Sequence, residues 1–248
     1  MSSNAKKLWL LLLLLIVLVG AGIFALYRSG YFEPPAPEAP EIIAPTINDI
    51  EDIEDYTAGK PIPERNPGKI LPPINLSDDH IRGPLDAKIS MVEYSSLSNP
   101  YASLIHTHLL TLLTDNNPDL NWIFRQYPRT SNVADMVAAE ATECVASLAG
   151  NDTFWKYLDA LFLRKNIARE SLLSGAVTLG VKRTDLDLCL TEHAKRDYVI
   201  LDKRDVQLQA KVFVIPTFIF INNETGETRV AEGLNTTKYF QEIIQELQ

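Results

Sequence analysis

Cysteine is the first residue type in this 248-residue chain to examine for chemistry, and it occurs twice, as Cys144 and Cys189. Disulfide exchange needs an attacking thiolate and a second thiol that resolves the mixed disulfide. These two residues do not have Cys-x-x-Cys spacing, and neither lies at a recognisable helix N-terminus. A bond between them would close a loop of about 45 residues, worth about 4 kcal/mol in the chain-entropy model. Three states are open: a structural disulfide, a displaced redox pair, or two free buried thiols.

Histidines and phosphate-binding motifs suggest no further catalytic or metal site. His106 and His108 are two positions apart, so they face different sides of a helix, and they lack acidic or thiol companions at ligand spacing. Nothing resembles a P-loop, a Ser-His-Asp set or a dinucleotide fingerprint. We therefore expect no cofactor and no metal, and the same holds for the remaining histidines, His80 and His193.

Asn99-Pro100-Tyr101-Ala102 begins a stretch with helical apolar spacing. Asparagine is a preferred N-cap and proline is favoured at the first helical position. We therefore interpret Asn99 and Pro100 as a structural cap, in preference to a catalytic role for Asn99.

The elements that must position these residues follow from hydrophobic period. Two β-type runs flank a helix, a long helical region follows at about 132–211, and two strands and a helix end the chain. A parallel pair joined by a crossover helix, followed by a terminal hairpin, predicts a thioredoxin-like α/β fold with a helical insertion. The expected elements are strand Lys88–Tyr94, helix Pro100 to about Asp115, strand Leu120–Gln126, strand Thr217–Asn222, strand Glu227–Glu232 and helix Thr236–Leu247.

Residues 33–80 are expected to be a linker between the N-terminal segment and one globular domain, residues 81–248. They contain ten of the 15 prolines, and 11 acids against three bases. Such a composition favours an extended, poorly packed chain, and we interpret it as a spacer. Four apolar residues recur there at near-helical spacing, which leaves open a short amphipathic turn that docks on another surface: Ile47, Ile50, Ile53 and Tyr56.

An uncharged apolar segment, Leu8–Tyr27, dominates residues 1–32. Its 20 residues would span about 30 Å as a helix, the thickness of a bilayer's hydrocarbon core. Two lysines precede it, so the positive-inside rule predicts a single-pass anchor in the cell membrane with a cytoplasmic N-terminus and an extracytoplasmic domain. A cleaved signal peptide is the competing interpretation, with a cleavage site near Val19-Gly20-Ala21.

Net charge argues against nucleic acid as a partner. The whole chain carries −9, of which the linker accounts for −8 and residues 81–248 for −4, while residues 1–32 carry three bases. Binding to phosphate groups needs a basic face, and no basic stripe interleaved with aromatic residues is present. The acidity belongs mostly to the linker.

Several segments in the right order resemble the DsbA-like thiol–disulfide oxidoreductases. The resemblance covers nearly all of residues 77–248 and includes an Ala-Glu-x-x-x-Cys run before a Phe-Trp pair, the LDLCLTEH segment and VIPTFIFIN. It implies a thioredoxin fold, a cis peptide bond at Ile215-Pro216 that faces the active-site helix, and a structural disulfide between Cys144 and Cys189. The residue before that proline can pair its backbone with an extended peptide in the family.

The active-site motif departs from the family pattern. Where Cys-Pro-Tyr-Cys or a close variant is expected, this chain has Asn99-Pro100-Tyr101-Ala102, and Ser96 replaces an acid that often precedes the motif. Asparagine and alanine supply neither a nucleophilic nor a resolving thiol. We therefore expect a domain that is redox-inactive at the usual site.

Three functions are consistent with these features. The favoured one is a peptide- or protein-binding module that presents Tyr101 and Ile215 to an extended peptide or an envelope protein. The second is an oxidoreductase that works through Cys144 and Cys189 or with an active relative. The third is a structural envelope domain in which the linker is the functional element. Fold alone does not choose between them.

Overall fold

The computed structural model describes residues 73–114 and 119–248. The expected anchor Leu8–Tyr27 and the proposed docking residues 47–56 lie outside the described residues. Within the described part, no helix is both long and apolar enough to cross a bilayer.

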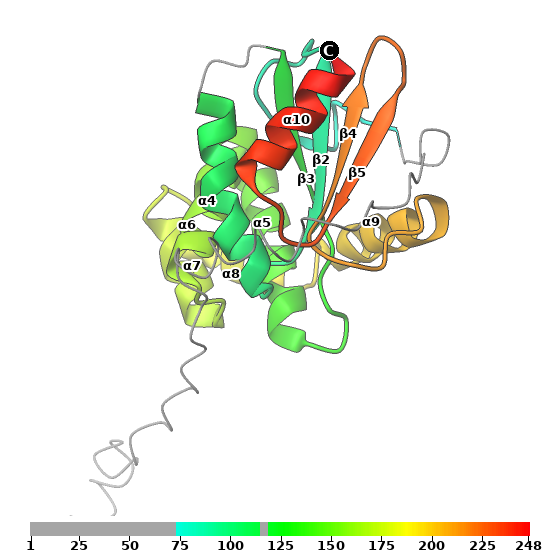
Figure 1. Cartoon of the computed structure of the whole chain (residues 1–248). Coiled ribbons are helices and arrows are strands. Elements are labelled where there is room, and N and C mark those ends of the chain that lie inside the picture. Colours follow the sequence, from blue (N-terminus) through cyan, green and yellow to red (C-terminus); the bar gives the residue numbers. More distant parts are fainter. Residues whose placement is uncertain (1–72, 115–118) are drawn as a thin grey trace, which may run out of the picture. The chain divides into compact units, whose positions relative to one another are not determined.

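A five-stranded mixed sheet forms the centre of the domain (Figure 1). Its spatial order is β1-β3-β2-β4-β5, with β2 and β3 parallel and the other pairs antiparallel. Helix α4 crosses from β2 to β3, and β4 and β5 form a hairpin, so the predicted thioredoxin-like topology is confirmed. The strands are β1 His80–Arg82, β2 Ile89–Ser95, β3 Leu120–Gln126, β4 Thr217–Asn222 and β5 Thr228–Glu232.

The long connection between β3 and β4 is entirely built on helices. The sequence predicts breaks near Gly150, Gly180 and His193, and helices end close to all three. A further break follows Lys165, which has a left-handed φ of 52°. The helices are α4 Pro100–Thr114, α5 Val133–Ala149, α6 Asn151–Arg164, α7 Arg169–Val177, α8 Arg183–Thr191, α9 Arg196–Gln209 and α10 Thr237–Leu247.

Strand β2 is fully buried because both faces of the sheet are covered. Its alternate side chains serve two cores, as period-2 geometry requires. Ile89 and Met91 join the larger core with α4, α6 and α10, whereas Val92 and Tyr94 join a smaller core with α9. The apolar run of β2 follows from this double burial.

Strand β1 is an element that hydrophobic period does not reveal. It is three residues long, pairs antiparallel with β3, and places only Ile81 in the core. Polar contacts attach it to the helices: His80 Nε2 lies 2.8 Å from Glu143 Oε2, and Arg82 donates to Asp159 at 2.7 Å. Tertiary contacts, and not a local hydrophobic pattern, therefore define this strand.

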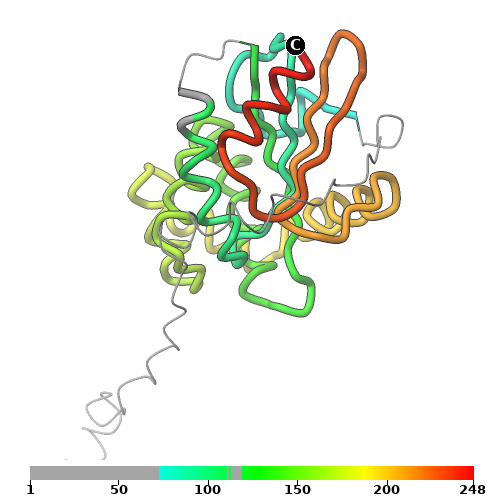
Figure 2. Tube along the Cα trace, in the orientation of Figure 1, coloured from blue at the N-terminus to red at the C-terminus, as the bar shows by residue number. Residues whose placement is uncertain are grey.

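The C-terminus lies beside the loops that lead into β2 and out of β4 (Figure 2). Lys88 Nζ donates to the carbonyl of Gln248 at 2.9 Å, and Asn222 Nδ2 donates to the carbonyl of Leu247 at 2.7 Å. The candidate site lies at the other end of the sheet, where β2 leads into α4.

Candidate functional site

Asn99 caps helix α4 at the carboxyl end of β2. Its Oδ1 accepts hydrogen bonds from the backbone N–H groups of Tyr101 at 2.9 Å and Ala102 at 3.3 Å. These N–H groups belong to the first turn of the helix, where they have no partner within the helix. The side chain of Asn99 therefore satisfies the donors that would otherwise stabilise an anion at this position.

The same side chain also bridges to the loop before β4. Asn99 Nδ2 donates to the carbonyl oxygen of Ile215 at 2.9 Å, and the Ile215-Pro216 peptide bond is cis. Two further hydrogen bonds fix this loop. Thr217 Oγ1 donates to the carbonyl of Val214 at 2.7 Å, and Gly233 N–H donates to the carbonyl of Pro216 at 2.7 Å. One amide thus joins the two halves of the site.

Exposed apolar side chains lie close to both ends of this bridge along the chain. Tyr101 is 51% exposed, and Phe213 and Val214, directly before Ile215, are 65% and 48% exposed. Among the described residues, the backbone N–H of Ile215 donates no hydrogen bond. The site therefore offers an unused backbone donor beside exposed apolar side chains, which are the groups that an extended peptide engages.

Asp135 organises the loop between β2 and α4. Its buried carboxylate accepts from Ser96 Oγ at 2.7 Å and 2.8 Å, from the N–H of Ser98 at 3.3 Å and from the N–H of Arg129 at 2.7 Å. The guanidinium of Arg129 also donates to Ser98 Oγ at 3.1 Å. Ser96 stands where the family often has an acid, and here it donates to the carboxylate of Asp135 in α5.

Glu93 is a buried acid in β2, on the strand that leads to the site. It is fully buried, and the indole N–H of Trp122 donates to its Oε2 at 3.0 Å. Burial raises the pKa of Glu93 from 4.5 to about 8, and the hydrogen bond from Trp122 offsets only part of that effect. At neutral pH the carboxyl is therefore protonated.

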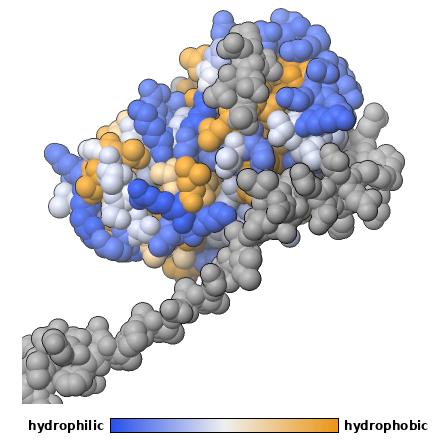
Figure 3. Space-filling model, turned by 60° about the vertical axis from the view of Figure 1, so that its left-hand side comes forward, coloured by the Kyte–Doolittle hydropathy of each residue, from blue (hydrophilic) through white to orange (hydrophobic). Residues whose placement is uncertain are grey.

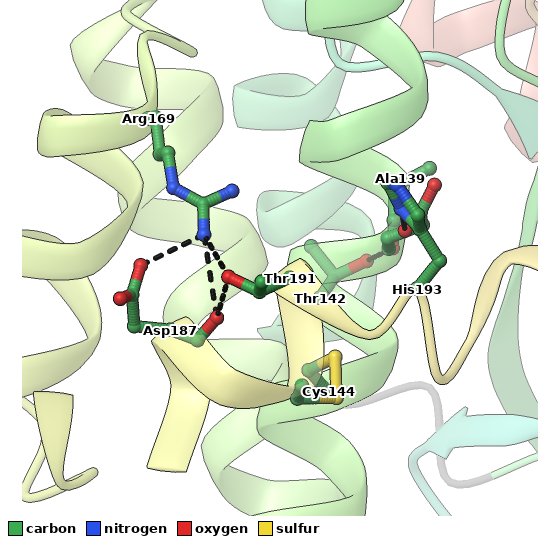
Figure 4. Close-up of a disulfide and its surroundings, with 9 residues drawn as sticks. Ala139, Thr142, Cys144, Arg169, Asp187, Thr191 and His193 are labelled. Carbon is green, nitrogen blue, oxygen red and sulfur yellow. Dashed lines mark hydrogen bonds and ion pairs between the residues drawn. A yellow bond between two sulfur atoms is a disulfide. The ribbon is translucent and has the colours of Figure 1, made fainter. Parts of the chain in front are cut away.

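The two cysteines form a disulfide between α5 and α8, so the expected structural bond is confirmed. Figure 4 shows this bond below an exposed cluster in which Arg169 on α7 donates to Asp187 and Thr191 on α8. Cys144 is fully buried. The arrangement ties three inserted helices together and leaves no thiol near Asn99.

The histidines are divided among separate polar contacts. His106 is buried, with Nε2 at 2.8 Å from Asp159 Oδ1, and His193 Nδ1 lies 2.9 Å from Glu140 Oε2. Burial lowers the pKa of His106, and the contact with Asp159 offsets part of the effect. Within the described residues, no group of three or more His, Cys, Asp or Glu side chains is placed to hold a metal.

Three residues of the site escape sequence reasoning: Glu93, Asp135 and Phe213. An acid inside the apolar run of β2 is a signal for Glu93, since buried acids are uncommon. Asp135 follows the cap Asn132 by three positions, which suggests a helix start but not its contacts with Ser96 and Arg129. Exposure of Phe213 has no sequence signal.

The face of the domain in Figure 3 shows apolar residues in small groups between hydrophilic ones.

The fold and the site together define a thioredoxin-fold domain of the DsbA type. Its sheet has the crossover helix α4, a helical insertion precedes β4, and a helix N-terminus faces a cis-proline loop. A family model described as thioredoxin matches residues 75–246, and the chain belongs to this family.

Solved structures show the same DsbA-like fold. α-DsbA1 from Wolbachia pipientis superposes with a TM-score of 0.62 at 21% identity, over 74% of this chain and 96% of that one. Oxidised BdbD from Bacillus subtilis has a TM-score of 0.61 at 17% identity, over 70% of this chain and 94% of that one. At these identities the likeness concerns the fold.

The curated relatives have higher identity, but the matching segment is only a part of each of these longer proteins. A Na⁺/H⁺ antiporter NhaA from Herminiimonas arsenicoxydans is 32% identical over 137 residues, which is 53% of this chain and 21% of the antiporter. NhaA 1 from Salinispora arenicola is 31% identical over 120 residues, 48% of this chain and 17% of that protein. The chain thus spans about a fifth of the length of the curated relatives it matches.

Proposed function

We propose that this protein is a redox-inactive binding module of the DsbA-like type, anchored by Leu8–Tyr27 with its domain outside the cytoplasm. The observation that carries the proposal is the side chain of Asn99. It occupies the helix N-terminus with an oxygen that has no thiol chemistry, and it holds the cis-proline loop through Ile215. An amide in this position stabilises the frame of the site without an exchange reaction.

The ligand that fits this frame is an extended peptide segment with an apolar side chain. The N–H of Ile215 supplies a backbone donor, and Tyr101, Phe213 and Val214 supply exposed apolar contacts. Backbone pairing gives affinity in such sites, and side-chain pockets give specificity.

A membrane transport protein is the partner class that the relatives favour. In two curated proteins the related sequence is part of a Na⁺/H⁺ antiporter. The anchor predicted at Leu8–Tyr27 would hold this domain at the membrane surface, where such a partner lies.

The first experiment is a disulfide-exchange assay on the full chain in detergent, with Asn99→Cys/Ala102→Cys beside it. We expect the natural protein to be inert and the double variant to gain exchange activity, because it restores the attacking and the resolving thiol that exchange requires. Cys144→Ala/Cys189→Ala is the control for the second function. Activity in the natural protein that this control abolishes would overturn the proposal in favour of an oxidoreductase.

The second experiment measures binding of fluorescent extended peptides by anisotropy. Tyr101→Asp and Phe213→Asp are expected to weaken binding at least tenfold, because a charge replaces an apolar contact. Leu163→Asp is the matched control, since Leu163 on α6 is also 65% exposed. Equal binding by all three variants would contradict a peptide site at this position. The third function, a structural domain, predicts a different result. A phenotype in cells that carry a shortened linker at residues 33–80, but not in cells that carry Tyr101→Asp, would favour it.

A further inference from the structure

A hollow of about 290 Å³ lies along one side of α9. Its floor is apolar: Val199 is fully buried, Met136 is 6% exposed, and Ile200 at the edge is 41% exposed. Its lining residues are Pro128, Thr130, Met136, Val199, Ile200, Lys203, Arg204 and Gln207.

The lining carries two cations, Lys203 and Arg204, and no acid. Within the described residues, Arg204 pairs with the neighbouring Asp205, at 3.1 Å. Both side chains are exposed, so this pair contributes little to stability and can exchange for another acidic partner. By contrast, the hollow on the opposite side of α9 is lined by four aspartates and Arg125. The first hollow therefore fits a ligand that combines apolar side chains with negative charge.

We propose that residues 46–56 of this same chain dock in the hollow beside α9. This segment contains five acids and no base, and its apolar residues recur at every third position, Ile47, Ile50, Ile53 and Tyr56. The segment lies outside the described residues, so the proposal rests on its sequence and on the chemistry of the hollow. Apolar side chains would fill the floor over Met136 and Val199, and the acids would pair with Lys203 and Arg204.

The chain between residues 46–56 and the domain is long enough for this segment to reach the hollow. Pro73, the first described residue, accepts a hydrogen bond from Arg125 at 3.1 Å and lines the acidic hollow together with Asp202 of α9. Sixteen residues lie between Tyr56 and Pro73, so this stretch of chain can span on the order of 55 Å at about 3.3 Å per residue. That reach exceeds the radius of gyration expected for a domain of this size, about 15 Å. Tethering also raises the effective concentration of the segment.

Docking would place an acidic segment beside the candidate site. Lys203 Nζ donates to the carbonyl of Pro128 at 2.8 Å, and the next residue, Arg129, donates from its side chain to Ser98 in the site loop. The linker would then determine which side of the domain faces the membrane.

Photo-cross-linking of the full chain in detergent tests this inference. p-Benzoylphenylalanine replaces Ile53, and in the matched control it replaces Ile43, which lies in the same linker but outside the proposed segment. We expect cross-links within one chain to peptides that contain residues 128–136 or 196–207. Arg204→Glu should reduce their yield at least threefold. Cross-links spread evenly over the domain, equal to those from position 43, would overturn the proposal.

Hydrogen exchange of the unlabelled chain gives an independent measure. Residues 128–136 and 196–207 should exchange faster in Ile50→Ser/Ile53→Ser than in the natural protein and in the control Ile42→Ser/Ile43→Ser. Equal exchange in all three proteins would contradict docking. Cross-links between two chains would show that a second copy supplies the segment and would also overturn the inference.

Discussion

The side-chain amide of Asn99 donates a hydrogen bond of 2.9 Å to the carbonyl oxygen of Ile215, 116 residues later in the chain. The same amide oxygen caps α4. Helix start and cis-proline loop are thus held together by one side chain in a place where the family carries its attacking thiol. This bridge explains how the frame of a redox site persists without its cysteines.

Asn99→Ala should lower the free energy of unfolding by about 2 kcal/mol, because it removes a cap and a long-range hydrogen bond. Urea unfolding followed by circular dichroism measures the change. Asn132→Ala is the control, since Asn132 caps α5 through the N–H groups of Ala134 and Asp135 without a comparable bridge. That variant should lose only about 1 kcal/mol. Equal losses would show that the contact with Ile215 adds nothing.

Glu93→Gln should change how stability depends on pH. Between pH 4.5 and 8 the unfolded chain has released a proton that the folded protein keeps on Glu93, because burial raises its pKa to about 8. The free energy of unfolding therefore falls by roughly 1.4 kcal/mol for each pH unit as pH rises through this window. Glutamine cannot ionise, so the variant should gain stability relative to the natural protein from pH 5 to pH 8.

Urea unfolding at several pH values measures this difference. Asp202, whose pKa burial raises to about 7, contributes equally to both proteins and cancels. Glu246→Gln, at an exposed position of α10, is expected to follow the natural protein. A constant difference between Glu93→Gln and the natural protein at all pH values would mean that Glu93 titrates normally.

Cys144→Ser/Cys189→Ser should lower the free energy of unfolding by up to about 4 kcal/mol, as expected for a loop of 45 residues. Reductant should destabilise the natural protein and leave the double variant unchanged. The test is urea unfolding with and without dithiothreitol. A loss below about 1 kcal/mol would contradict a stabilising role for the bond.

Asp135→Asn should loosen the loop before α4, because an amide has one acceptor oxygen for the donors Ser96, Ser98 and Arg129. A loss of about 2 to 3 kcal/mol is expected for a buried charged acceptor. Hydrogen exchange at Ser98 and Arg129 should quicken. The control is Asp152→Asn: Asp152 also lies in the first turn of a helix, α6, but it is exposed, and the variant should lose less than about 1 kcal/mol.

Much of the fold follows from local sequence. Strands Leu120–Gln126 and Thr217–Asn222 begin and end where their β-type runs predict. The helix at Pro100 follows from capping chemistry, and the loss of exchange chemistry at the usual site is expected from residues 99 and 102 alone. These features depend on residue type and on near neighbours.

Other features arise only from tertiary contacts. Strand His80–Arg82 has no apolar period of its own and exists because it pairs with β3 and contacts Glu143 and Asp159. A raised pKa at Glu93 needs full burial, which depends on the packing of helices against the sheet.

The sequence by itself determined most of the elements and which chemical groups the site lacks, because backbone propensity, hydrophobic period and side-chain type are local properties. Tertiary structure decided which partners the remaining polar groups have. Asn99 with Ile215 and Ser96 with Asp135 are pairs of residues far apart in the chain, and their contact depends on how the whole sheet and its helices pack.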